Sequence, residues 1–366
     1  MLKCRVTTSK EILVRSRLRF WKYPLSIILL LLVFAAFTFV YLLSDTAAAP
    51  YERIDPPEDT IMATPDPEDE PPDESVDDPA DDPVDEPVDD PTDEPEPVFV
   101  EEGFITLEME ENEIHQGYLL LVNHDHTFTI PNNLDLVRIV DARTTQFRVQ
   151  PESSRLLRSV MEPLDEMMAD FRTATNNRSV AIRSAHRDYE MQQSILNRYI
   201  SQMGRREALR WAALPRHSEH HTGLAFDFGV MSGNTMNTFT GTSNTVWFRR
   251  NSYRYGFILR YPQNKTHITQ TNHEPWHFRY VGLPHSALIH QNDWCLEEFI
   301  ENIRNYTYEE PMEFEHDGVL YGIYFAEGTS IRIPINTEFD ISGNNIDGFI
   351  VTIVWLDFDP DNILEV

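Results

Sequence analysis

An acidic, proline-rich segment divides this chain and limits how much of it can fold. Residues 50–97 form a loose Asp-Pro and Glu-Pro repeat, with 21 acidic residues and one basic residue, Arg53. The segment contributes most of the formal net charge of −30 carried by the 366 residues. The like charges in this segment repel one another, and the segment contains too few apolar residues to form a core. We expect a disordered, stiff spacer; an acidic tail that binds cations or a partner is the alternative.

The residues before this segment predict a membrane anchor. Residues 24–43 contain no charged side chain, and about twenty apolar residues at a rise of about 1.5 Å span the hydrocarbon core of a bilayer. Residues 1–23 carry seven basic residues and one acid. The positive-inside rule therefore predicts a cytoplasmic tail, a single-pass anchor and an extracytoplasmic remainder. A cleaved signal peptide is the alternative, because small residues follow at 46–50.

The folded part begins near Val98, and its patterns predict an α+β fold. Helices and strands do not alternate there in a regular βαβ rhythm. Helical spacing of apolar residues predicts a helix over 152–174, which Pro163 would kink or divide. Further helices are predicted at 188–204 and 285–306, and strands at 117–131, 179–187, 224–231 and 278–284. Residues 306–366 are rich in Val, Ile, Tyr and Phe, which predicts a small β module that either binds a partner or supports its neighbour.

Histidines and acids gather in two places, "RHSEHHTGLAFDF" at 216–228 and "NHEPWHFRY" at 272–280. The only cysteines, Cys4 and Cys295, are expected on opposite sides of the membrane, so a metal site here must use His and carboxylate ligands. A catalytic zinc takes three such ligands and leaves a fourth position open.

Three residues provide that count, namely His220, Asp227 and His277. Glu274 is a further carboxylate that could move a proton, if a bend at Pro275 brings it beside His277. Spacing alone leaves open a polar surface patch instead. The remaining histidines of the two clusters are expected to be hydrogen-bonded or solvated side chains rather than ligands; they are His217, His221 and His273.

Both clusters resemble the motifs of the VanY-type D-alanyl-D-alanine carboxypeptidases. "SEHHTGLAFD" (218–227) is similar to that family's Ser-x-His-x-x-Gly-x-Ala-x-Asp signature, and residues 256–286 are similar to its second block, which ends in Glu-Pro-Trp-His. "SAHRDYEMQQ" (184–193) and "LVNHDHTF" (121–128) resemble two further stretches. The resemblance covers roughly residues 115–305. It implies the small zinc-peptidase fold shared with D-Ala-D-Ala dipeptidases and the Hedgehog signalling domain, within a catalytic domain over 98–305.

The resemblance also implies an activity and a set of roles. The family's zinc peptidases remove the terminal D-alanine from peptidoglycan stem peptides. Carried across by position, the roles are zinc ligand for His220, Asp227 and His277, catalytic base for Glu274, oxyanion stabiliser for Arg187, and substrate contact for Ser218 and Gln192. The sequence departs from the family pattern at His186, Ala185, His221 and the turn "TQTNH" before Glu274. These departures affect the expected shape of the substrate groove.

Two other functions compete with this one. A peptidoglycan endopeptidase would use the same metal chemistry, and a non-catalytic zinc-containing wall-binding module would need neither Glu274 nor Arg187. The groove walls decide between D,D- and L,D-specificity, and the sequence leaves that choice open. Nucleic acid is an unexpected partner, because the outer part of the chain is acidic and would repel phosphate.

Overall fold

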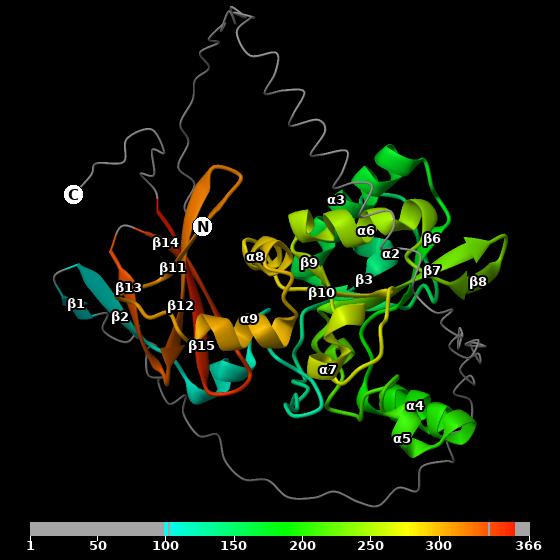
Figure 1. Cartoon of the computed structure of the whole chain (residues 1–366), viewed down its shortest axis with the longest axis horizontal. Helices are drawn as coiled ribbons and strands as arrows, with labels where there is room; N and C mark the ends of the chain where they lie inside the picture. The colour runs from blue at the N-terminus through cyan, green and yellow to red at the C-terminus, as the bar shows by residue number, and fades with distance from the viewer. Residues whose placement is uncertain (1–98, 102, 336, 356–366) are drawn as a thin grey trace, which may run out of the picture. The chain divides into compact units, whose positions relative to one another are not determined.

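The computed structural model describes residues 99–101, 103–335 and 337–355, which all belong to one compact unit (Figure 1). The predicted tail at 1–23, anchor at 24–43 and linker at 50–97 lie outside the described residues. Among the described helices, none is both long enough and apolar enough to cross a bilayer.

A six-stranded sheet carries the two clusters of histidines and acids. Its strand order is β4 (Arg148–Val149), β6 (Val180–Ser184), β7 (Ala225–Ser232), β10 (His277–Tyr280) and β9 (Phe257–Leu259), with β8 (Thr235–Thr238) paired to β7. All neighbours are antiparallel except β4 and β6. A small ladder joins β3 (Leu136–Arg138) to β5 (Arg155–Leu157). Helices on a mainly antiparallel sheet confirm the α+β prediction for this region.

Helix α3 (Arg158–Thr175) covers one face of this sheet (Figure 1). Its buried stripe packs on Phe226, Phe228 and Phe278, in one apolar cluster with α6. Pro163 lies inside α3 without dividing it, and the helix begins later than predicted because 155–157 form β5. The shorter helices are α2 (Ile139–Ala142), α5 (Arg205–Ala208), α6 (Val246–Asn251) and α7 (Thr266–Thr269).

Helix α4 (Tyr189–Met203) has the ends that the sequence predicts. The Asp188 side chain accepts a hydrogen bond from the Met191 N–H at 2.7 Å, and Gly204, at a φ of 81°, follows the last turn. The predicted helix over 285–306 is instead two helices, α8 (His285–Gln291) and α9 (Leu296–Ile303). The Glu298 carboxylate accepts from the Cys295 N–H at 2.8 Å, and this cap starts α9 as a separate element.

The strand predicted over 117–131 is wrong. Only residues 119–122 and Phe128 of this segment are buried, and it has no regular structure, because side chains and loops satisfy its backbone instead of a neighbouring strand. The Leu119 N–H donates to Ser342 Oγ at 2.9 Å, and Asn345 Nδ2 donates to the Leu121 oxygen at 2.8 Å. These polar partners lie more than 200 positions further along the chain, so the local sequence pattern could not reveal them.

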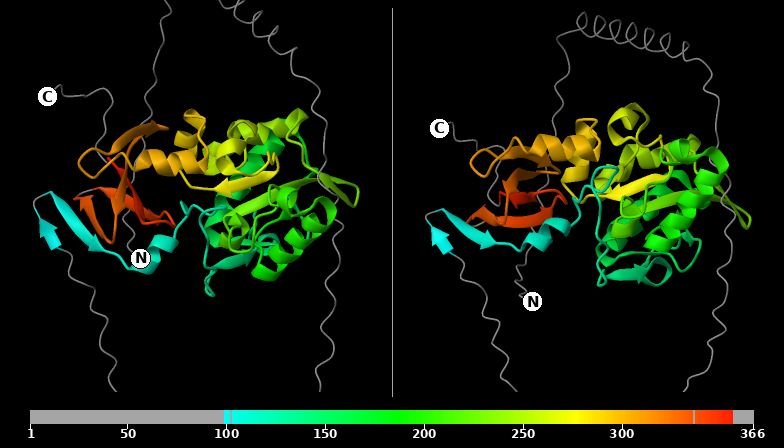
Figure 2. Two further views of the ribbon diagram at one scale, coloured as in Figure 1. Left: turned by 60° about the horizontal axis from the view of Figure 1, so that its bottom comes forward. Right: turned by 90° about the horizontal axis from the view of Figure 1, so that it is seen from below.

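The C-terminal residues form the predicted β structure. An antiparallel sheet runs in the order β11 (Met312–His316), β12 (Val319–Glu327), β15 (Gly348–Val354) and β14 (Glu338–Gly343). Beside it, β13 (Ser330–Pro334) pairs with β2 (Phe104–Glu108), which pairs with β1 (Phe99–Glu101) (Figure 2). Residues 99–108 therefore add strands next to this module, far from their place in the sequence.

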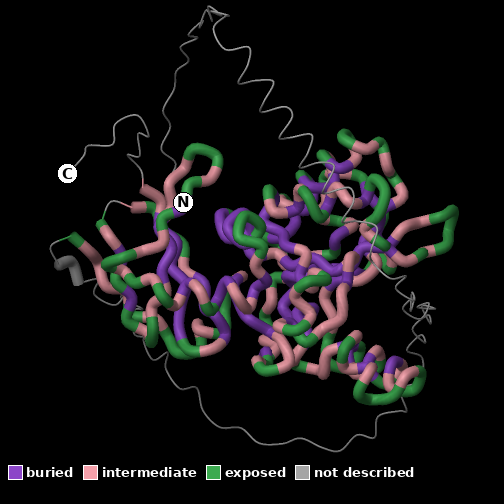
Figure 3. Tube along the Cα trace, in the orientation of Figure 1, coloured by how far each residue is buried: buried purple, intermediate pink, exposed green. Residues whose placement is uncertain are grey.

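The region that carries the two His/acid clusters and the C-terminal sheet share an apolar core. Phe314, Ile323 and Ile350 of the C-terminal strands belong to the same buried cluster as Leu119 and Phe299. Buried residues lie along the strands of both sheets (Figure 3). The shared core favours the supporting role for the module over that of a separate binding domain.

Asn345→Ala tests this support. The Asn345 side chain donates to the carbonyl oxygens of Leu121 and Thr127, so its loss would remove the donor from both oxygens, and the bond to Leu121 is buried. We expect the free energy of unfolding of this variant, measured in urea, to be about 1–3 kcal/mol lower than that of wild type. The exposed Asn305→Ala is the control and should change stability little. Equal stabilities of the two variants would contradict a supporting role.

Candidate metal centre and catalytic site

The register between β7 and β10 places Asp227 directly opposite His277. Side chains alternate along a strand, so Phe226 and Phe228 enter the core beneath α3 while Asp227 takes the other face. Phe278 follows His277 in the same way. The alternating pattern in the sequence therefore puts a carboxylate and an imidazole together on one face of the sheet.

His220 reaches the same point from the short 3-10 turn η2 (Glu219–Thr222). Gly223 then turns the chain into β7 at a φ of 72°, and a Cβ there would lie 2.8 Å from the Leu136 side chain. Only glycine suits both the conformation and the space. His220 Nδ1 donates to the Ala185 carbonyl oxygen at 2.6 Å, which leaves Nε2 as the free acceptor, 3.4 Å from Asp227 Oδ2.

His220, Asp227 and His277 fit a metal ion. Each offers one ligand atom, these atoms all lie within 4.8 Å of one another, and all three residues are buried. His277 Nδ1 lies 3.0 Å from Asp227 Oδ1. Two imidazole nitrogens and one carboxylate oxygen make the donor set of a zinc site with an open position. The spacing-based alternative, a solvated surface patch, is therefore wrong.

The electrostatics of the cluster also suit a cation. Burial and the nearby Arg187 lower the pKa of His220 to about 4, so its imidazole is neutral at pH 7. Burial alone would lower the pKa of His277, but the hydrogen bond to Asp227 and the nearby Glu219 carboxylate outweigh it and raise the value to about 9. Burial would raise the pKa of Asp227, yet His220 and Arg187 hold it well below its usual value. A metal would replace the His277 proton that faces Asp227.

Glu274 joins the cluster through a turn at Pro275. The His277 N–H donates to the Glu274 carbonyl oxygen at 3.2 Å, so the chain bends as the sequence predicts. The Glu274 Oε2 atom lies 3.7 Å from His277 Nδ1. Burial raises the pKa of Glu274 to about 8. The nearby His277 opposes this rise, and the Asp227 carboxylate adds to it. A carboxyl group with such a pKa can both accept and return a proton near neutral pH.

Arg187 lies at the edge of the cluster. Its Nη2 donates to Asp227 Oδ2 at 2.6 Å, and its Nη1 donates to Gln192 Oε1 at 3.2 Å. Gln192 is only 1% exposed, and its Nε2 donates to the Ala213 carbonyl oxygen at 2.8 Å. Its amide therefore orients Arg187 in this structure. Ser218 is buried directly before η2, two residues from His220.

The remaining histidines of the two clusters are hydrogen-bonded to backbone, as expected. His217, His221 and His273 donate through Nδ1 to the carbonyl oxygens of Asn123, Arg187 and Tyr261, at 2.7–2.8 Å. None of them belongs to a group of potential metal ligands in the described part of the chain.

Sequence reasoning missed a set of charges buried beside His277. Glu219 lies between two arginines, Arg260 and Arg279, and Arg260 also pairs with Glu297. Glu219 stands inside the first motif, but a single acid beside a histidine gives no sign that it will be buried. Two arginines in or next to apolar strands were the available signal, because buried guanidinium groups require acidic partners.

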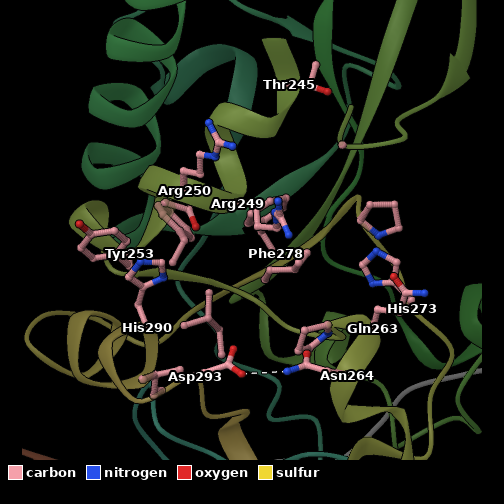
Figure 4. A pocket seen from close by; sticks show the side chains of 18 of the residues that line it. Thr245, Arg249, Arg250, Tyr253, Gln263, Asn264, His273, Phe278, His290 and Asp293 are labelled. Carbon is pink, nitrogen blue, oxygen red and sulfur yellow. Dashed lines mark hydrogen bonds between the residues drawn. The ribbon is translucent and has the colours of Figure 1, made fainter. Parts of the chain in front are cut away.

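A cavity of about 680 Å³ lies elsewhere on the sheet (Figure 4). It is lined by Phe278, which leaves β10 on the face opposite to His277, and by Arg249, Tyr253 and His290. It reaches the two neighbours of Glu274 in the sequence but none of the three potential metal ligands. The metal cluster, not this cavity, is therefore the candidate site.

A buried His-Asp-His cluster with an adjacent carboxylic acid defines the class of mononuclear metallohydrolases. The profile of VanY, described as D-alanyl-D-alanine carboxypeptidase, matches residues 153–283. A D-alanyl-D-alanine carboxypeptidase of Enterococcus faecium is 32% identical over 249 residues, which cover 66% of this chain and 77% of that protein. The chain belongs to this family of D-alanyl-D-alanine carboxypeptidases, and the predicted family and hydrolase class are confirmed.

One solved structure supports the fold. The vancomycin resistance D,D-dipeptidase VanXYg, crystallised with a D-Ala-D-Ala phosphinate analogue, is 35% identical with a TM-score of 0.62. The match covers 69% of this chain and 99% of that one. A mutant of the vancomycin resistance D,D-pentapeptidase VanY, solved with Zn(II), is 30% identical with a TM-score of 0.40, covering 50% of this chain and 98% of that one.

The raised pKa of Glu274 gives a pH signature in the metal-free protein. The folded state holds a proton up to about pH 8, whereas the unfolded state loses it near 4.5. Between these two pH values the unfolded state therefore binds fewer protons than the folded state. The free energy of unfolding falls as the pH rises through this range, by at most about 1.4 kcal/mol per pH unit. After chelation, Glu274→Gln should unfold at a higher temperature than wild type at pH 7.5 but not at pH 4.

The exposed Glu162→Gln is the matched control for this measurement. It should leave the melting temperature unchanged at both pH values. A Glu274→Gln variant with the wild-type pH profile would show that the acid ionises normally in the folded protein.

Proposed function

We propose that the chain removes the terminal D-alanine from peptidoglycan stem peptides as a zinc-dependent carboxypeptidase. The single observation that supports this most is the convergence of His220, Asp227, His277 and Glu274 on one buried point. Membership of the family supplies the substrate class. A bound zinc would polarise the scissile carbonyl and make water a stronger nucleophile.

The proposed roles of the protein's own groups follow from where they lie. Glu274 accepts the proton of the attacking water and returns it to the leaving amine, which its raised pKa allows. Arg187 donates to the oxygen that becomes negative as the carbonyl is attacked. Its bond to Asp227 is the contact that would have to give way to a substrate oxygen.

Two further residues are proposed to act on the substrate. Ser218 lies beside η2 and would contact the peptide directly. Gln192 would also contact the substrate, and its hydrogen bond to Arg187 would couple that contact to the guanidinium group.

A peptidoglycan endopeptidase is the nearest alternative, since the same groups would cut a cross-link. A non-catalytic wall-binding module is the alternative of another class. The nearby Glu274, whose acid has no use in a structural zinc site, favours the enzyme. Product analysis by mass spectrometry on pentapeptide, tetrapeptide and cross-linked stems would separate the three and also D,D- from L,D-specificity.

Glu274→Gln tests the chemical step. The amide keeps size and shape but cannot take the proton, so release of terminal alanine should fall by about 10²–10⁴-fold. Zinc content should remain at wild-type level, because Glu274 is not among the proposed ligands. Near wild-type turnover at matched zinc content would rule out Glu274 as the base, and tight stem-peptide binding without any turnover in wild type would favour the binding module.

We further propose that residues 24–43 anchor the chain in the cell membrane, with the N-terminus in the cytoplasm and residues 50–97 as a spacer outside. The support is the uncharged segment between a basic flank and an acidic one. Protease added to intact cells should then release the folded domain by cutting within 50–97. A domain that stays intact until the cells are lysed would place it on the inner side.

A further inference from the structure

One carboxylate in the site has no part in the proposed chemistry. Glu219 Oε2 lies 3.5 Å from His277 Nε2, on the side of the imidazole away from Asp227. Both atoms are buried, and neither has a hydrogen-bond partner among the described residues. A buried acceptor and a buried ring nitrogen thus face each other with no other group to satisfy them.

The other oxygen of Glu219 is fully used. Its Oε1 accepts from Arg260 Nε and from Arg279 Nη1, each at 2.7 Å. Arg260 also forms a two-bond pair with Glu297, at 2.8 and 2.6 Å. Arg279 completes its bonds at the carbonyl oxygens of Tyr118, Leu120 and Tyr280. The two guanidinium groups therefore fix Glu219 with one oxygen directed at His277.

Stability alone does not account for this arrangement. Glu219, Arg260 and Arg279 have fully buried side chains, and taking such charges out of water costs several kcal/mol each. Well-packed apolar residues of similar volume often serve stability equally well. What apolar residues could not supply is an anion aimed at the ring of a metal ligand.

We propose that Glu219 is a positioning residue for the metal centre, which accepts the Nε2–H of His277 and so presents Nδ1 to the metal. The inference rests on the proposed zinc function. A histidine ligand that donates its second N–H to a carboxylate is fixed in both tautomer and ring orientation. His220 is fixed in the opposite sense, because its Nδ1 donates to the Ala185 oxygen and Nε2 is the nitrogen left to bind a metal.

Zinc release from the purified full-length protein tests this role without reference to activity. Loss of the carboxylate in Glu219→Gln should speed the transfer of zinc to a chelator by about 10–100-fold. Glu297→Gln is the matched control, because it removes a carboxylate from Arg260 but does not touch His277. It should lower stability and leave the release rate unchanged.

A second pair of variants guards against a folding defect in Glu219→Gln. Arg279→Met with Glu219→Gln removes one charge of each sign from the buried set, and Arg279→Met alone keeps Glu219. The double variant should release zinc about 10–100-fold faster than the single one. Equal release rates within each pair would overturn the role of Glu219, whereas a wild type that binds no zinc would overturn the proposed function itself.

Nitrogen NMR of the wild-type protein, loaded with ¹¹³Cd in place of zinc, needs no variant. Of the imidazoles coupled to cadmium, one should be bonded through Nε2 and the other through Nδ1. The second should keep a slowly exchanging Nε2–H in contact with a carboxylate. Two imidazoles bonded through Nε2 would overturn the inference, because Glu219 would then face a metal-bound nitrogen.

Discussion

The pairing of β7 with β10 is the constraint on which the site depends. A slip of one residue would turn Asp227 toward the aromatic core and move Phe226 or Phe228 into its place. Burial of those rings beneath α3 therefore does more than stabilise the sheet. Each buried ring fixes the face of the sheet on which the neighbouring polar side chain lies. The positions of Asp227 and His277 are therefore set by the packing of the aromatic core.

The charges around the ligands are nearly balanced, and this explains how so polar a centre can be buried. Asp227 is offset by Arg187, while Glu219 and Glu297 are offset by Arg260 and Arg279. Glu274 is the exception. No arginine pairs with it in the described structure, its pKa rises to about 8, and it is the group proposed to exchange protons. Unequal pairing of neighbouring carboxylates thus separates one reactive acid from several inert ones.

The sequence predicted those parts of the fold that depend on local pattern. The cap at Asp188, the stop at Gly204 and the alternation through Asp227 all lie within a few residues of what they determine. The two His/acid clusters could be found because a metal site restricts residue type, not only position. The coil at 117–131 could not be predicted, because its hydrogen-bond partners, such as Ser342 and Asn345, come from the far end of the chain. Glu219 was missed because its burial depends on Arg260 and Arg279, which lie 41 and 60 positions further along the chain.

The coil at 117–131 has a consequence for when the enzyme becomes complete. Its carbonyl oxygens at Tyr118 and Leu120 hold Arg279, while Leu121 is held by Asn345 near the last strand. Every proposed catalytic group is translated by residue 277, yet Asn345, which holds this coil, follows about seventy residues later. A chain truncated before Asn345 would possess all the proposed ligands but would lack the side chain that holds the coil at Leu121. The order of translation thus supplies the ligands before the residue that holds this coil in place.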